Sequence, residues 1–205
     1  MRHLPNSLTV LRILLTPILF YLILDASSFS DYIVIYYLFV IAGLTDIYDG
    51  KLARSQKNIT TFGKFVDPIA DKLLLAATLI PFYMLSDYVS ICRWVTLPIL
   101  LILLGREALV TLLRYYSMGI GSIFSASRLA KFKTAFQMLF IGSILVHLAH
   151  RRMMIEYPEH AFGWFDPIHD KLNAVVIAIV VVLSIASALE YIIKNLPVIL
   201  KHSRA

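Results

Sequence analysis

The sequence predicts an all-α integral membrane protein with six transmembrane helices and a short N-terminal interfacial segment. Of its 205 residues, 59% are apolar and 16% are charged, whereas an average soluble domain has about 25% charged residues. Its mean hydropathy is +0.77. Six stretches come close to the roughly 20 mostly apolar residues that a helix needs to cross the hydrocarbon core of a bilayer. We expect one membrane domain over residues 1–205.

The interfacial segment is expected at Leu4-Pro5-Asn6-Ser7, because Asn6 or Ser7 can cap a following helix and Pro5 lies just outside it. The expected transmembrane helices, in chain order, are 8–25, 32–54, 65–86, 92–115, 132–150 and 173–196.

Basic residues alternate between the links that join these helices. The second and fourth links are rich in Lys and Arg, and the first and third are poor. The positive-inside rule therefore puts both termini and the two basic links in the cytosol. We expect the fifth link, 151–171, outside, although Arg151 and Arg152 oppose that placement.

The net charge of +6 comes from residues scattered between apolar runs, so we expect no nucleic-acid partner. Since Cys92 is the sole cysteine, an internal disulfide is excluded.

Four carboxylates fall within one short window of the predicted membrane region. Asp46 and Asp49 are three residues apart, and Asp67 and Asp71 are four apart, so each pair shares one helix face. A short link makes the two helices antiparallel neighbours, which brings the pairs together. Because such charges are costly in a membrane unless compensated, the cluster predicts two hard divalent cations, Mg²⁺ or Mn²⁺.

Small residues lie beside these acids, and they leave room for a flat base or a diphosphate. Gly50 and Ala53 share the helix stripe of Asp46 and Asp49, and Gly63 lies beside Asp67. Arg54 can donate to phosphate oxygens. The alternatives are close helix packing for the glycines and a topology signal for Arg54.

A second cluster is basic, and two interpretations of it stay open. It can form an anion pocket for a phosphorylated substrate, or its long side chains can extend to the interface as topology signals. Arg106 can also pair with Glu107 or with an aspartate. We expect His147, His150, His160 and His169 to be interface or loop residues rather than metal ligands. The basic candidates are Arg106, Arg114, Lys131 and Lys133.

The window from Asp46 to Asp71 reads D-x2-D-G-x2-A-R-x8-G-x3-D-x3-D. This pattern resembles the signature of the CDP-alcohol phosphatidyltransferase family. The opening Leu4–Thr9 with Leu11-Arg12-Ile13, the run Gly105–Arg114 and the run Lys131–Thr134 resemble the branch of the family that uses glycerol 3-phosphate as acceptor.

The resemblance implies that the chain transfers a phosphatidyl group from CDP-diacylglycerol to sn-glycerol 3-phosphate, giving phosphatidylglycerophosphate and CMP. It implies that Asp46, Asp49 and Asp67 hold the metals, while Asp71 helps to hold one and acts as the catalytic base. The implied CDP-binding residues are Asp46, Gly50, Ala53, Arg54 and Gly63. The acceptor phosphate is assigned to Arg106, Arg114, Lys131 and Lys133.

The resemblance also implies a homodimer among membrane lipids, in a bacterial inner membrane, with its active site facing the cytosol. Inositol phosphate or phosphatidylglycerol is the alternative acceptor within the family. A divalent-cation transporter and a non-catalytic scaffold are the alternatives outside it. A transporter needs acids near the bilayer midplane, whereas these lie toward one end of each helix.

Overall fold

The computed structural model describes residues 4–56, 61–86, 90–119, 128–160 and 162–202, with side chains for 10–45, 69–86, 92–116, 129–159 and 162–195. Over these residues the chain is helical and contains no strand, which confirms the all-α prediction. The elements are α1 (Leu4–Asp25), α2 (Phe29–Gln56), α3 (Thr61–Met84), η1 (Ser90–Trp94), α4 (Leu97–Gly119), α5 (Arg128–Glu156), η2 (Pro158–His160) and α6 (Phe165–His202).

Two of these helices are long and apolar enough to cross a membrane, within the part of the chain that the structure describes. They cover Leu129–Glu156 in α5 and Phe165–Asn195 in α6. These two support a membrane protein, and the full set of six crossings stays a prediction.

Three expected boundaries were wrong. The segment at Leu4–Ser7 is the first turn of α1 rather than a separate element, because a proline in the first helical turn removes no helix hydrogen bond. Residues 92–94 belong to the 3₁₀ turn η1, and α4 begins at Leu97. The fifth link is also shorter than expected, because α5 continues through Arg151 and Arg152 to Glu156.

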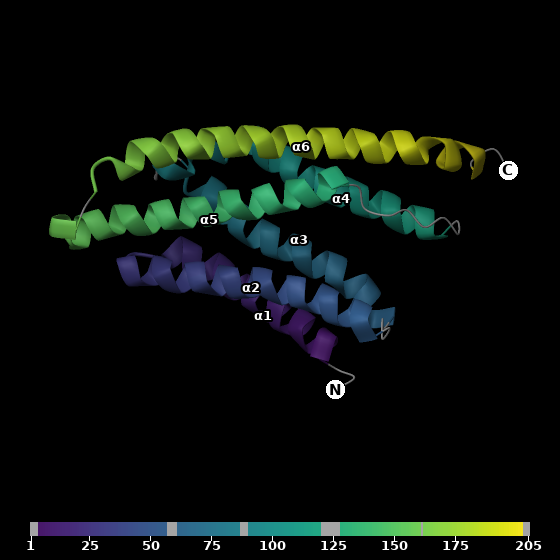
Figure 1. The fold of residues 1–205 in the computed structure, drawn as a ribbon, viewed down its shortest axis with the longest axis horizontal. Helices are drawn as coiled ribbons and strands as arrows, with labels where there is room; N and C mark the ends of the chain where they lie inside the picture. The colour runs from purple at the N-terminus through teal and green to yellow at the C-terminus, as the bar shows by residue number, and fades with distance from the viewer. Residues whose placement is uncertain (1–3, 57–60, 87–89, 120–127, 161, 203–205) are drawn as a thin grey trace.

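The helices form two groups that share one apolar core: α1, α2 and α3 make one group, and α4, α5 and α6 make the other. α1 packs against α2 and α3, α5 packs against α6, and α4 packs against α6 and α3. In Figure 1 the long helix α6 runs along the top with α5 beneath it, and α1 and α2 lie at the bottom. Contacts between α2 and α5 join the groups. Phe82 and Phe140 are fully buried in the core between them.

The start of α2 is fixed by a reciprocal pair of caps. The backbone N–H of Asp31 donates to Ser28 Oγ at 3.2 Å, and the N–H of Ser28 donates to Asp31 Oδ2 at 2.8 Å, which is a capping box. Backbone hydrogen bonds from Ser27 and Ser28 hold the pKa of Asp31 below its usual value. Glu156, at the end of α5, accepts a 2.7 Å hydrogen bond from the N–H of Phe29. The beginning of α2 therefore meets the end of α5.

The start of α6 is tied to α5 through Asp166. Its Oδ1 lies 2.9 Å from His150 Nδ1 and 3.2 Å from His147 Nε2, and its Oδ2 accepts a 3.3 Å hydrogen bond from Arg151. Both histidines are buried. They lie within α5 rather than in a loop, enclosed by the packing of α6, and their position relative to the membrane interface stays a prediction. His160 lies outside the side chains that the structure describes.

Candidate active site

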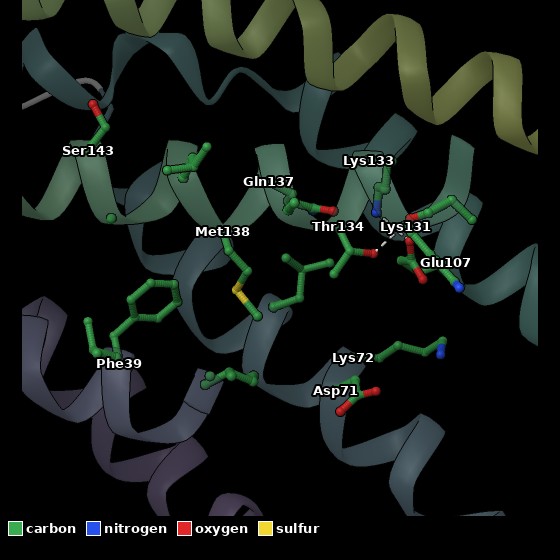
Figure 2. A pocket seen from close by; sticks show the side chains of 18 of the residues that line it. Phe39, Asp71, Lys72, Glu107, Lys131, Lys133, Thr134, Gln137, Met138 and Ser143 are labelled. Carbon is green, nitrogen blue, oxygen red and sulfur yellow. Dashed lines mark hydrogen bonds and ion pairs between the residues drawn. The ribbon is translucent and has the colours of Figure 1, made fainter. Parts of the chain in front are cut away.

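A cavity of about 1130 Å³ opens between the helices and has charged side chains over part of its wall. All six α-helices contribute to its lining. Figure 2 shows Asp71 and Lys72 of α3 facing Glu107, Lys131 and Lys133 across this space. The structure thus brings Asp71 and the basic candidates of α4 and α5 into one cavity, although they lie far apart in the sequence.

Asp71 is held by an arginine from another helix. Arg12 of α1 donates through NH1 to Asp71 Oδ1. The Arg12 side chain is 1% exposed, whereas that of Asp71 is 46% exposed. A buried guanidinium in an apolar helix is costly unless it is paired. Arg12 therefore fixes the direction of a carboxylate that stays accessible from the cavity.

The four basic candidates all line this cavity. Lys133 is 1% exposed, Arg106 and Arg114 are partly buried, and Lys131 is exposed. The Nε atoms of Arg106 and Arg114 are buried and have no hydrogen-bond partner. Because a buried N–H group without an acceptor is costly, these two atoms favour an anionic ligand. Arg106 is also held by the Ser187 hydroxyl, which accepts from its NH2 at 2.9 Å.

Glu107 compensates part of this positive charge. Its Oε1 accepts a 2.9 Å hydrogen bond from Arg106 NH1 and a second hydrogen bond from Lys133 Nζ. The expected pairing of Arg106 with Glu107 is confirmed. Among the described lining residues, six Lys or Arg side chains still face only two carboxylates, Asp71 and Glu107. The cavity is therefore cationic at this end.

The other predicted site residues cannot be compared with this geometry, because they lie outside the described side chains. They belong to the end of α2 and the beginning of α3, which are joined by four residues, 57–60. So short a link keeps the two helix ends within roughly 19 Å of each other. The predicted site residues that lie outside the described side chains are Asp46, Asp49, Gly50, Ala53, Arg54, Gly63 and Asp67.

Asp71 is the described member of the predicted metal-binding quartet. An accessible carboxylate at the cavity wall fits the oxygen donors that Mg²⁺ and Mn²⁺ prefer. No group of three His, Cys, Asp or Glu residues that could hold a metal ion occurs among the described side chains. The divalent-metal site thus stays a prediction based on the acidic motif.

Two charged lining residues that pair with predicted site residues were missed by the sequence analysis. Arg12 is the sole Lys or Arg in the expected helix 8–25, and a lone basic residue inside such a helix is itself a signal of a functional site. Glu107 gave a weaker signal of a functional site, because a simple ion pair with its neighbour Arg106 already accounted for its charge. Its second partner, Lys133, is 26 residues away, and only the packing of α4 near α5 brings the two together.

Two membrane-capable helices, an acidic motif in the sequence and a cavity with a cationic wall together define the class of protein, and comparison with known proteins gives its family. Residues 2–165 match the family model described as CDP-alcohol phosphatidyltransferase. The chain belongs to this family, and it is therefore a phosphatidyltransferase.

Curated relatives resemble the chain over most of its length. A protein of Wigglesworthia glossinidia brevipalpis is 37% identical over 70% of this chain and 76% of the relative. One of Bacillus subtilis is 35% identical over 72% and 78%, and one of Rickettsia typhi is 41% identical over 71% and 77%. Each is named CDP-diacylglycerol–glycerol-3-phosphate 3-phosphatidyltransferase.

Proposed function

We propose that the protein transfers the phosphatidyl group of CDP-diacylglycerol to sn-glycerol 3-phosphate, releasing CMP and forming phosphatidylglycerophosphate. The observation on which the proposal depends is that one cavity combines Asp71 with the cationic side chains of α4 and α5. The Asp71 carboxylate suits proton removal from an alcohol. The cationic side chains suit an acceptor that carries its own phosphate. The names of the relatives support the same reaction.

In this proposal Asp71 takes the proton of the acceptor's primary hydroxyl. The hydroxyl oxygen then forms a bond to the phosphorus that carries the diacylglycerol, and the bond from that phosphorus to the CMP oxygen breaks. A positioned carboxylate is a suitable general base for this step. Arg12 keeps the carboxylate directed into the cavity.

The acceptor's phosphate is assigned to the cationic wall. Arg106 and Arg114 offer guanidinium groups that suit phosphate oxygens, and Lys131 and Lys133 add positive charge. Binding the phosphate there directs the other end of glycerol 3-phosphate toward Asp71. Phosphatidylglycerol has no phosphomonoester, so this wall favours glycerol 3-phosphate over it.

The diphosphate of the donor is assigned to the acidic motif. Mg²⁺ or Mn²⁺ held by Asp46, Asp49, Asp67 and Asp71 would neutralise the diphosphate and stabilise the departing CMP. The nucleotide is assigned to Asp46, Gly50, Ala53, Arg54 and Gly63.

We also propose that the active site faces the cytosol of a bacterial inner membrane and that the protein is a homodimer. The basic links of the sequence support this orientation. In this arrangement water-soluble glycerol 3-phosphate enters the cationic end, and the lipid substrate enters from the bilayer.

An acceptor screen tests the reaction. Purified protein with Mg²⁺ or Mn²⁺ and labelled CDP-diacylglycerol should release CMP when glycerol 3-phosphate is added, and not with inositol phosphate or phosphatidylglycerol. Equal release with inositol phosphate would overturn the acceptor but not the family. Asp71→Asn should abolish turnover while nucleotide binding persists. Near-normal turnover of that variant would overturn the role of Asp71 as base.

A further inference from the structure

The cavity extends beyond the charged wall into an apolar region. Farther from the motif along α2 and α3, most lining residues are apolar, among them Phe39, Leu44 and Leu74. Met138 and Val146 of α5 line the same region. The cavity therefore has a cationic end for charged groups and an apolar part that suits hydrocarbon.

Gln137 lies at the boundary between these two parts. It follows Lys133 by four residues on α5, so the two side chains share one helix face about 6 Å apart along the axis. The Gln137 side chain is 2% exposed and lines the cavity. Figure 2 shows it between Lys133 and Met138. An amide thus stands where the charged wall gives way to the apolar one.

The amide nitrogen of Gln137 has no hydrogen-bond partner in the protein. Two polar neighbours on α5, Thr134 and Ser143, do have hydrogen-bond partners within the protein. Thr134 donates to the carbonyl of Ala130 at 3.1 Å, and Ser143 donates to Asn173 Oδ1 at 2.6 Å. Because buried donors are nearly always paired in native proteins, the Gln137 amide points to an acceptor on a ligand.

We propose that Gln137 donates a hydrogen bond to an ester carbonyl oxygen of the lipid substrate. This inference rests on the proposed function. In a diacylglycerol lipid the ester carbonyls lie between the phosphate and the acyl chains, which is the position of Gln137 between the charged and apolar walls. A carbonyl oxygen only accepts hydrogen bonds, so it matches a donor that has no partner.

An ether-linked substrate tests this contact directly. A dialkyl analogue of CDP-diacylglycerol keeps the chains and the diphosphate but lacks the carbonyl oxygens. In mixed micelles we expect the wild-type protein to use the ester substrate roughly three- to tenfold better in kcat/KM, as one hydrogen bond provides. Gln137→Leu should bring this ratio close to one by losing rate on the ester substrate alone.

Thr134→Val is the matched control, because its hydroxyl on the same face already has a protein acceptor. It should keep the wild-type preference for the ester lipid. We expect Gln137→Leu to retain its melting temperature in detergent, since the lost amide nitrogen makes no hydrogen bond within the protein. Gln137→Met, which also removes the amide and keeps the length of the side chain, should give the same ratio near one.

Three results would overturn the inference. The first is an ester preference that survives in both Gln137 variants. The second is a rise in the KM for glycerol 3-phosphate in the Gln137 variants, which would assign the amide to the acceptor's hydroxyl. The third is a wild-type protein that does not distinguish the two lipids. A wild-type protein that releases no CMP from either lipid would instead overturn the proposed function, and the inference with it.

Discussion

Arg12 is buried in an apolar helix, and its described partner is the carboxylate proposed as the base. We expect Arg12→Gln to lower kcat by on the order of 10²-fold, the scale of loss when a catalytic group is misplaced by about 1 Å. The KM for glycerol 3-phosphate should change much less, because the phosphate is assigned to other residues. CMP release at varied acceptor concentration measures both constants.

Arg12→Lys is the control for this prediction, because it keeps the charge and loses the planar fork of donors. It should recover part of kcat. If both variants raised KM and left kcat intact, Arg12 would bind substrate instead of positioning Asp71. Melting temperatures of both variants separate either result from unfolding.

Glu107 neutralises part of the cationic wall, and so it opposes the binding of an anion there. Removing a unit charge about 7 Å from a ligand changes its binding free energy by roughly 2 kcal/mol at an effective dielectric constant of 20. We expect Glu107→Gln to bind inorganic phosphate roughly thirtyfold more tightly, as measured by calorimetry. Glu190→Gln removes a carboxylate that pairs with Lys194 at 2.5 Å and does not line the cavity, and it should leave phosphate affinity unchanged. Weaker phosphate binding by Glu107→Gln would show that Glu107 mainly holds Lys133 and Arg106 in place.

At the scale of helices, Asp166 connects α5 to α6 through three side chains. Two of its partners, His147 and His150, are buried, so Asp166→Asn should cost about 1–3 kcal/mol of stability by weakening hydrogen bonds to buried groups. For a protein of this size that lowers the melting temperature by several degrees.

The matched control for Asp166 lies one turn along the same helix. Asp170 pairs with Arg93 at 3.0 Å, with side chains 35% and 52% exposed, and exposed pairs contribute about 0–1 kcal/mol. Asp170→Asn should therefore shift the melting temperature less than Asp166→Asn. Equal shifts would mean that Asp166 does not stabilise the junction of α5 and α6.

The number and order of the described α-helices could be predicted from the sequence, because each of them overlaps one of the mostly apolar stretches. The ends of the helices could not, since hydrogen bonding continues past the apolar run, as at Glu156 in α5. Asp71 was found from its spacing within the acidic motif. Its pairing with Arg12, 59 residues away, depends on how α1 packs against α3, and spacing along the chain carries no information about that packing.

At the scale of the whole molecule, the cavity joins a charged wall to an apolar one. A transferase acting on one water-soluble and one lipid substrate needs both environments within a single cavity, and the described lining residues provide both. The ends of the long helix α6 offer a test of how this cavity is oriented in the membrane.

Cysteine labelling tests that orientation in a protein whose single native cysteine, Cys92, is buried. In a Cys92→Ser background, Gly163→Cys places a thiol just before α6, where an added Cβ meets nothing within 4 Å. Lys194→Cys places one near the other end, at a side chain that is 66% exposed. About 30 residues of helix separate these positions, or roughly 45 Å, more than the hydrocarbon core of a bilayer. A membrane-impermeant maleimide applied to spheroplasts should label Gly163→Cys, and it should label Lys194→Cys only after lysis. The reverse pattern would put the cationic end of the cavity outside the cell, and labelling of both before lysis would show that α6 does not cross the membrane.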